Sequence, residues 1–400
     1  MYGGVGFVSL SAMTVIPRRT VLTLGAAGAA TLVAGAPAHA TTGSEDWSAP
    51  LRKAIEKVPD GPPATTTAAQ VRVTAAAGTW QGRSGTADVR SGRPVPAGAR
   101  FRIGSVTKLF TATVVLQLAA EGRLGLDTPV ERYLPGLLPA EYATATVRHL
   151  LDHRTGLPSP AMPDDVAWQI AHRYDRYTAE QLIRAALRNE RKFAPGAFQQ
   201  YTNMGYIVAG VLIRRLTGRP YGDEITRRIL RPLGLRGTVV PGDDPEIRGP
   251  HAHGYQLLGD ELIDVTSWNQ SVTPAAGDLI STLGDLDTFT RALLGGHLLP
   301  PAQQRELFAI PGKPDFVSGG PARFSAGLSR IAVLPGGREV WGKSGGRYGY
   351  NAAIAATPDA SFRLVYSVNS TDAKSEATNP VIERVSAAAV GILMAQGAAG

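Results

Sequence analysis

A serine and a lysine stand three residues apart in an apolar segment, FRIGSVTKLFTATVVLQLAAEGRLGLD (residues 101–127). On a helix, residues i and i+3 share one face, so Ser105 and Lys108 are expected side by side. A serine hydroxyl is a poor nucleophile until a neighbouring base takes its proton, and a desolvated lysine near other cations can serve as that base. The plainer alternative makes Ser105 an N-cap and Lys108 a snorkelling surface residue. Because this spacing is common by chance, it needs support from other residues.

Two further groups supply that support. PGAFQQYTNMGY places Tyr201 and Asn203 two apart in an extended loop before a helix, so both can point the same way. A tyrosine hydroxyl between two ammonium groups can shuttle protons, and an asparagine amide can orient a substrate amide. REVWGKSGGRYGY then carries Lys343 and the small residues 344–346 on a predicted strand, where a substrate backbone can lie along the edge. Each pattern alone is weak, but together in this order they are specific.

In this order the motifs resemble those of the penicillin-recognising serine hydrolases, in the branch of secreted D-alanyl-D-alanine carboxypeptidases, class C β-lactamases and related esterases. The resemblance covers roughly residues 65–395. It also includes the segments TVRHLLDHRTGLP and AAGDLISTLGDLDTF.

The resemblance implies a role for each matching residue. Ser105 would attack the substrate carbonyl and become acylated, and Lys108 and Tyr201 would manage the proton. Lys343 would tune Tyr201, and Asn203 would hold the acyl-side amide.

The resemblance also implies a substrate-binding edge. Ser344 would help bind the substrate carboxylate beside Gly345, and the backbone N–H groups of Ser105 and Gly346 would form an oxyanion hole. Arg330, on the neighbouring predicted strand, matches an arginine that binds the terminal carboxylate in carboxypeptidase members; its alternative is a surface position. Those carboxypeptidases often carry histidine where this chain has Lys343.

The alternation of strand-like and helical patterns predicts a mixed α/β fold of the α+β type. An antiparallel sheet, flanked by N- and C-terminal helices, is expected from residues 41–104 and 251–400. A mainly helical domain, residues 105–250, is inserted between them, with the site in the cleft between the two. This is the β-lactamase/transpeptidase-like arrangement that the resemblance implies.

The first 40 residues resemble an export signal. Arg18 and Arg19 precede an apolar stretch that ends at the small-x-small site Ala38-His39-Ala40, which favours a twin-arginine leader over an ordinary one. No second stretch is long enough to span a bilayer. The predicted product is secreted and keeps no stable membrane span once the signal is removed.

Composition excludes several functional classes. The net charge is +8, but no basic run or aromatic-interleaved patch accompanies it, so nucleic-acid binding is not predicted. The chain has no cysteine, which excludes thiolate metal sites, cysteine nucleophiles and disulfides. No cofactor is expected, and the predicted state is a monomer.

A competing nucleophile motif fails on its context. Residues 342–346 also match the GxSxG elbow of α/β-hydrolases, with Ser344 as nucleophile. That motif needs a following helix and a later histidine, yet the last of the seven histidines is His297.

Two histidine pairs are weak metal candidates. His251 and His253 have ligand spacing on one predicted strand face but no obvious carboxylate partner, so exposed strand histidines are the better interpretation. His149 and His153 share a helical face without the glutamate of a zinc protease motif, which favours a structural role. The sequence predicts no metal site.

The sequence therefore predicts a secreted serine D-alanyl-D-alanine carboxypeptidase acting on peptidoglycan stem peptides and acylated by β-lactams. A class C-like β-lactamase or a small-ester hydrolase would use the same residues. The alternative of another class is a non-catalytic cell-wall-binding or sensor protein.

Overall fold

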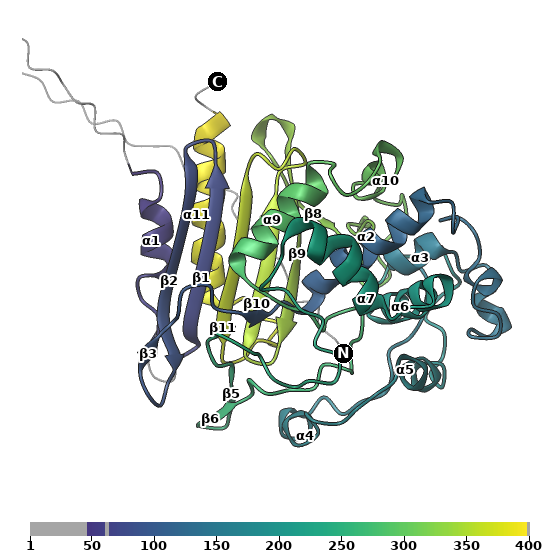
Figure 1. Ribbon diagram of the computed structural model, residues 1–400, viewed down its shortest axis with the longest axis horizontal. Helices are drawn as coiled ribbons and strands as arrows, with labels where there is room; N and C mark the ends of the chain where they lie inside the picture. Colours follow the sequence, from purple (N-terminus) through teal and green to yellow (C-terminus); the bar gives the residue numbers. More distant parts are fainter. Residues whose placement is uncertain (1–45, 61–63, 398–400) are drawn as a thin grey trace, which may run out of the picture.

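A seven-stranded antiparallel sheet organises the chain (Figure 1). The computed structural model describes residues 46–60 and 64–397, and the predicted export signal, residues 1–40, lies outside them. In spatial order the strands are β3 (Arg93–Pro94), β2 (Gly78–Asp88), β1 (Thr66–Ala75), β11 (Arg363–Ser370), β10 (Tyr350–Ala356), β9 (Arg338–Arg347) and β8 (Ser329–Leu334). Two small pairs accompany it, β4 (Phe101–Arg102) with β7 (Ile280–Ser281), and β5 (Tyr255–Leu258) with β6 (Glu261–Asp264).

The helices form three sets: the terminal helices α1 and α11, the single helix α9, and a group that lies mainly within residues 104–233. They are α1 (Ala49–Ile55), α2 (Thr107–Ala120), α3 (Val147–Leu151), α4 (Val166–Ala171), α5 (Ala179–Ala186), α6 (Met204–Thr217), α7 (Tyr221–Ile225), α8 (Arg231–Leu233), α9 (Leu283–Leu294), α10 (Pro301–Glu306) and α11 (Pro380–Gly397). The short 3₁₀ segments are η2 (Gly104–Val106), η3 (Val130–Arg132), η4 (Ala140–Tyr142) and η6 (Pro335–Gly337), and η5 (Thr226–Leu230) is a short π-helix.

Strand alternation assigns different cores to the two sheet faces, because successive side chains point to opposite sides. Val71 and Val73 of β1 pack in one core with α1 and α11, while Arg72 between them reaches Asp287 of α9. The terminal helices therefore cover one face and α9 the other. The α9 side also joins the core of the helical region, in which α2 is buried nearly all round.

The fold class is confirmed: a large antiparallel sheet combines with helices as the sequence predicts. Some boundaries differ. The run RFSAGLSRIAVL forms a strand only from Ser329, and the predicted helix at Ser105 begins as the 3₁₀ turn η2, with α2 starting at Thr107. The division at residues 104 and 250 into a sheet domain and an inserted helical domain stays a prediction.

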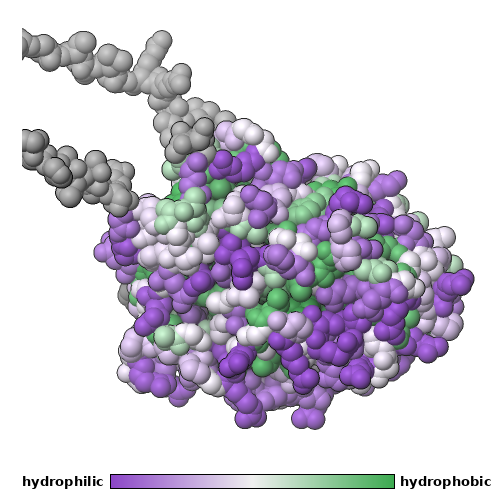
Figure 2. Space-filling model, turned by 45° about the horizontal axis from the view of Figure 1, so that its top comes forward, coloured by the Kyte–Doolittle hydropathy of each residue, from purple (hydrophilic) through white to green (hydrophobic). Residues whose placement is uncertain are grey.

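On the face seen in Figure 2, polar residues dominate the surface and apolar residues form smaller patches. Among the described residues, no helix combines the length and apolar character that a bilayer crossing requires.

A buried ion pair fastens α9 to the sheet. The Asp287 carboxylate accepts from Arg363 Nε at 2.7 Å and lies 3.3 Å from Arg72 Nε. Both Asp287 and Arg363 are only 9% exposed at the side chain. Loss of Asp287 would leave a buried guanidinium without its charge partner, and such losses are costly.

We therefore expect Asp287→Ala to lower the free energy of unfolding by about 3 kcal/mol, measured by urea denaturation. The matched control is Glu180→Ala, which removes the exposed pair with Arg214 and should cost at most about 1 kcal/mol. Equal losses in the two variants would show that the buried pair does not fasten α9.

Candidate active site

The turn that carries Ser105 lies directly against strand β9. Gly104 has φ of +49°, and a Cβ there would lie 2.7 Å from the backbone nitrogen of Gly346. A Cβ on Gly345 would lie 2.0 Å from the Ile103 carbonyl oxygen and 2.5 Å from the Ser105 nitrogen. Only glycine permits this approach, which brings the backbones of Ser105 and Gly346 together.

Lys108 lies one turn beyond Ser105 and has three polar partners. Its Nζ lies 3.2 Å from Ser105 Oγ, 2.7 Å from Asn203 Oδ1 and 2.8 Å from the Ala276 carbonyl oxygen. The amide and carbonyl oxygens can only accept, whereas the serine hydroxyl can also donate. A neutral amine fits this set: it donates twice and offers its lone pair to the Ser105 proton.

The surroundings of Lys108 favour the neutral form. Its side chain is fully buried, and this desolvation holds the pKa well below the usual lysine value, assisted by the positive charges of Lys343, Lys374 and Arg347. The buried carboxyl of Asp278 acts in the opposite direction but is the smallest of these influences.

The segment that supplies the Ala276 carbonyl is held in a strained conformation. Ala275 has φ of +61°, a region that non-glycine residues rarely adopt. Its own carbonyl accepts from the Thr111 hydroxyl of α2 at 2.7 Å. Thus α2 both carries Lys108 and fixes one of its acceptors.

Tyr201 lies between two lysines, as the sequence predicts. Lys108 Nζ lies 4.9 Å and Lys343 Nζ 4.5 Å from its ring centroid. Burial raises the pKa of the Tyr201 phenol, while a side-chain hydrogen bond with Ser105 opposes that rise. Tyr201 therefore lies within hydrogen-bonding contact of Ser105, and a phenol hydroxyl can both donate and accept.

Lys343 projects from β9 into the same group and is 5% exposed. Burial lowers the pKa of Lys343 to about 7, with a smaller contribution from the charge of Arg323. Sequence reasoning missed Arg323, because it belongs to no motif and acts through its position just before β8.

Of the remaining predicted residues, two lie beside the lysines of the site and Arg330 does not. Asn203 stands at the N-cap position of α6, but its side-chain oxygen accepts from Lys108 and does not cap the helix. Ser344 is buried on β9 beside Lys343. Arg330 is 44% exposed at the side chain and pairs with Glu339, 3.2 Å away. The described contacts of Arg330 therefore join it to the β8–β9 hairpin and not to Ser105.

At the site, strand β9 extends beyond the end of its pairing with β8. Pairing with β8 runs from Leu334↔Arg338 to Ser329↔Gly342. Among the described residues, no strand pairs with 343–347 on that side, so this edge can receive an extended ligand.

Gln199, two residues before Tyr201, joins three segments and was not identified from the sequence. Its amide nitrogen donates to the carbonyls of Asp152 and Phe324, both at 2.8 Å. Its amide oxygen accepts from the backbone N–H groups of Arg323 and Phe324 at 2.9 and 3.0 Å. This fully buried glutamine uses all four of its hydrogen-bonding positions to hold the Tyr201 loop.

The predicted histidine pairs do not form a metal site in the described part of the chain, where no group of three or more potential ligands occurs. His149 caps α3 through Thr146, a structural role. His153 packs against Tyr201, with ring centroids 4.5 Å apart, and its Nδ1 accepts from Thr202 N–H.

The second histidine pair differs from expectation. His253 does have a carboxylate partner, Asp264, at 2.7 Å. Both His251 and His253 are half-buried and precede β5, so they are not exposed strand residues. The sequence did not indicate Asp264 as the partner of His253, because Asp264 lies on a different strand, β6, and comes near His253 only after folding.

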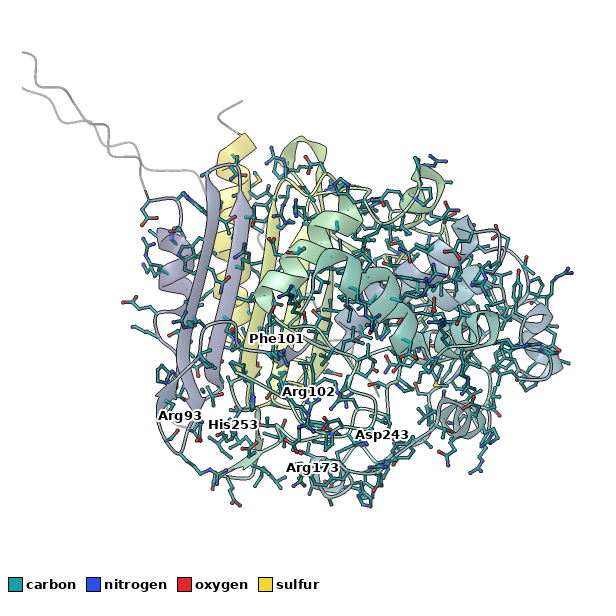
Figure 3. The ribbon with its side chains drawn as sticks, viewed as in Figure 1. Arg93, Phe101, Arg102, Arg173, Asp243 and His253 are labelled. Carbon is teal, nitrogen blue, oxygen red and sulfur yellow. The ribbon has the colours of Figure 1, made fainter. Side chains whose placement is uncertain are left out.

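A buried arginine supports the strand that leads into the Ser105 turn. Arg102, labelled below Phe101 in Figure 3, is 1% exposed and donates to the carbonyls of Pro245 (2.5 Å) and Thr266 (2.7 Å). Burial lowers the pKa of Arg102 to about 10. It ties two loops to β4.

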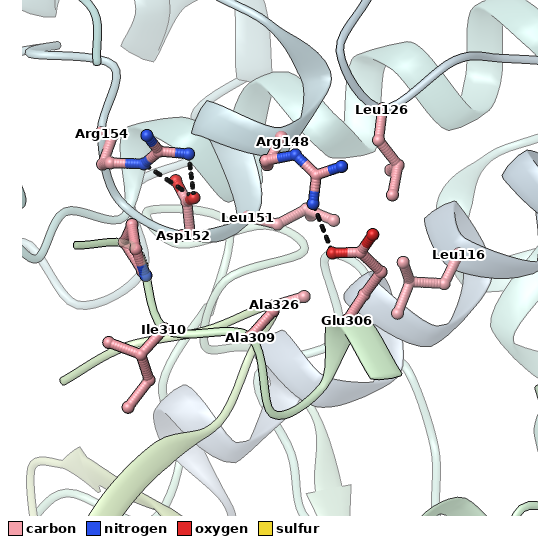
Figure 4. Close-up of a pocket in the computed structure, with 11 residues that line it drawn as sticks. Leu116, Leu126, Arg148, Leu151, Asp152, Arg154, Glu306, Ala309, Ile310 and Ala326 are labelled. Atoms are coloured by element: carbon pink, nitrogen blue, oxygen red, sulfur yellow. Dashed lines mark hydrogen bonds and ion pairs between the residues drawn. The ribbon is translucent and has the colours of Figure 1, made fainter. Parts of the chain in front are cut away.

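The cavity in Figure 4, about 170 Å³, lies elsewhere, between α2, the end of α3 and α10. Its polar lining is already paired, Arg154 with Asp152 and Arg148 with Glu306. Neither Ser105 nor Lys108 lines it, so it is not the candidate site.

Comparisons with known proteins agree with this geometry. Residues 51–388 match the family model described as Beta-lactamase. Penicillin-binding protein 4* of Bacillus subtilis (strain 168) is 31% identical over 242 residues, 56% of this chain and 51% of that protein. The chain thus spans about half the length of this curated relative.

Solved structures match over greater lengths. A D-stereospecific amidohydrolase from Streptomyces sp. has 34% identity and a TM-score of 0.71, covering 82% of this chain and 96% of that one. A D-amino acid amidase from Ochrobactrum anthropi SV3, complexed with D-phenylalanine, has 27% identity and a TM-score of 0.72, covering 88% and 99%.

The burial of Lys343 should be visible in the pH dependence of stability. Its folded pKa of about 7 lies below the unfolded value of about 10.4. Between these values the unfolded state binds more protons, so stability rises with pH. We expect the difference in unfolding free energy, wild type minus Lys343→Met, to increase by up to about 1.4 kcal/mol per pH unit above pH 7.

Urea denaturation from pH 6 to 9 measures this difference, with Lys313→Met as the control at a position outside the site. A wild-type minus Lys343→Met difference that stays constant with pH would contradict the lowered pKa.

Proposed function

The chain belongs to the Beta-lactamase family of serine hydrolases, and we propose that it is a D-alanyl-D-alanine carboxypeptidase that acts through an acyl-enzyme on Ser105. Its substrates would be peptidoglycan stem peptides, and penicillins would acylate the same serine. Export through a signal within residues 1–40 would bring it to the cell wall.

In the proposed reaction, Ser105 Oγ attacks the carbonyl carbon while its proton moves to Lys108 Nζ. When the tetrahedral intermediate collapses, the C–N bond breaks and the departing amine receives a proton through Tyr201. Water then attacks the acyl-enzyme ester, which releases the acid and returns the proton to Ser105. General-base assistance of this kind contributes about 10²–10⁴-fold in rate.

The single observation that carries the proposal is the set of three partners of Lys108. Two acceptor-only oxygens, from Asn203 and Ala276, use the two N–H bonds of a neutral amine, which directs the lone pair to Ser105 Oγ at 3.2 Å. Desolvation lowers the pKa of Lys108 and so favours the neutral form of that amine.

The charge around the site supports a substrate with a free carboxylate. Lys343, Lys374 and Arg347 all act on Lys108 as positive charges, and Arg323 acts on Lys343. The one carboxyl among the main influences on Lys108, Asp278, already accepts from the Tyr221 hydroxyl. An anionic chain end is therefore attracted more strongly than an α-ammonium group.

A small-ester hydrolase is a second candidate, favoured by one contact at the β9 edge. Lys374 Nζ donates to the Gly346 carbonyl oxygen at 2.8 Å. An ester substrate needs no acceptor there, whereas a peptide that pairs with the strand does.

We expect benzylpenicillin to add its mass to the wild type and not to Ser105→Ala, measured on the intact protein by mass spectrometry. Lys108→Met should fold but acquire the adduct at least about 100-fold more slowly, because the general base is lost. Labelling of Ser105→Ala at the wild-type rate would refute the assignment of the nucleophile. Rapid drug loss without an adduct would indicate β-lactamase activity instead.

A substrate panel then ranks the candidates. We expect the greatest kcat/KM on a peptide ending in D-Ala-D-Ala, compared with D-phenylalanine amide, p-nitrophenyl acetate and a chromogenic cephalosporin. A higher kcat/KM on D-phenylalanine amide would replace the carboxypeptidase with an amidase, and activity on p-nitrophenyl acetate alone would favour the ester hydrolase.

A further inference from the structure

Lys374 contacts the candidate site but belongs to none of the three sequence motifs that contain Ser105, Tyr201 and Lys343. It follows β11, in the loop that leads to α11. The residue as a whole is exposed, but its ammonium group lies in a part-buried contact with β9. There Nζ donates to the Gly346 carbonyl at 2.8 Å and lies 5.9 Å from the Tyr348 ring centroid.

The register of the β9–β10 hairpin decides which edge of β9 this contact occupies. Arg347 and Tyr350 are opposite each other across a two-residue turn, so they form the hydrogen-bonded pair that closes it. Hydrogen-bonded and non-hydrogen-bonded pairs alternate along an antiparallel ladder. The next pair, Gly346↔Asn351, is therefore of the second kind, and Gly346 directs both its N–H and its C=O away from β10.

That outward edge is the one a substrate would use. Pairing with β8 ends at Gly342, and Gly346 lies against the Ser105 turn. An acyl group laid along it as an added strand would place its carbonyl at the Gly346 N–H and donate its own amide N–H to the Gly346 C=O. Lys374 already donates to that second position.

We propose that Lys374 is a specificity-determining residue that occupies the acceptor for an acyl-side amide N–H, so that the site favours acyl groups with a hydrogen-bond acceptor or negative charge there. This rests on the proposed acyl-enzyme chemistry at Ser105, and within that chemistry it favours the ester-hydrolase candidate over the carboxypeptidase. A peptide must displace the ammonium from Gly346, whereas an ester of a simple keto acid or a related acyl group need not.

The electrostatic surroundings support the same preference. Arg347 is the neighbouring charge that acts on Lys374, and Lys374 acts in turn on Lys108. Burial of the ammonium end lowers the pKa of Lys374 to about 7. Positive groups on this edge disfavour an α-ammonium on the substrate. A competing substrate N–H would remove the hydrogen bond between Lys374 and the Gly346 carbonyl.

The test uses two p-nitrophenyl esters that differ in one group. The ester of N-acetylglycine carries an amide N–H beside the acyl chain, and the ester of 4-oxopentanoic acid has CH₂ in its place. In Lys374→Met the Gly346 carbonyl is vacated, so the kcat/KM ratio of the first ester to the second should rise about two- to tenfold over wild type. Because both esters meet the same enzyme sample, a change in the folded fraction cancels in the ratio.

Lys374→Arg is the matched control, since it retains a cationic donor, and its ratio should stay within about twofold of wild type. Lys374→Ala repeats the test if the methionine variant folds poorly. An unchanged ratio in both neutral variants, or an equal loss on both esters, would overturn the role in specificity. If Ser105→Ala hydrolysed the esters at the wild-type rate, that result would overturn the proposed function itself, and this inference with it.

Discussion

The burial of a lysine without a carboxylate partner is the constraint on which this site depends. Lys108 is fully enclosed, and the charges that act on it most strongly after desolvation are positive. Burial of an unpaired ammonium is costly, and the molecule avoids that cost by favouring the neutral amine. Burial also raises the pKa of Asp278 to about 6, so this nearby carboxyl is a weakened counter-charge.

Much of the surrounding structure serves that constraint. Helix α2 is buried nearly all round, which encloses Lys108. The strained turn at Ala275 and the cap residue Asn203 provide its two acceptors. The glycine contact between the Ser105 turn and β9 brings the backbones of Ser105 and Gly346 together, and their role as an oxyanion hole stays a prediction. One strand edge thus supplies both the cation Lys343 and a place for the substrate.

The sequence predicted the fold class and the meeting of Ser105, Lys108, Tyr201 and Lys343, because their spacing within helices and strands limits where their side chains can go. It does not determine contacts that depend on register or on distant loops. Arg330 has suitable spacing, but the β8–β9 pairing sets it beside Glu339. Gln199 and Lys374 belong to no motif, and their partners are side by side only after the chain folds.

The most direct test of this account is the titration of Lys108 itself. The ε-carbon or Nζ signal of Lys108, assigned by comparison with Lys108→Met, can be followed by NMR in protein labelled with ¹³C and ¹⁵N at lysine. The account predicts that this signal reports a neutral amine at a pH well below the ordinary lysine pKa of about 10.4. A signal that stays protonated up to that pH would contradict the role of Lys108 as the base for Ser105.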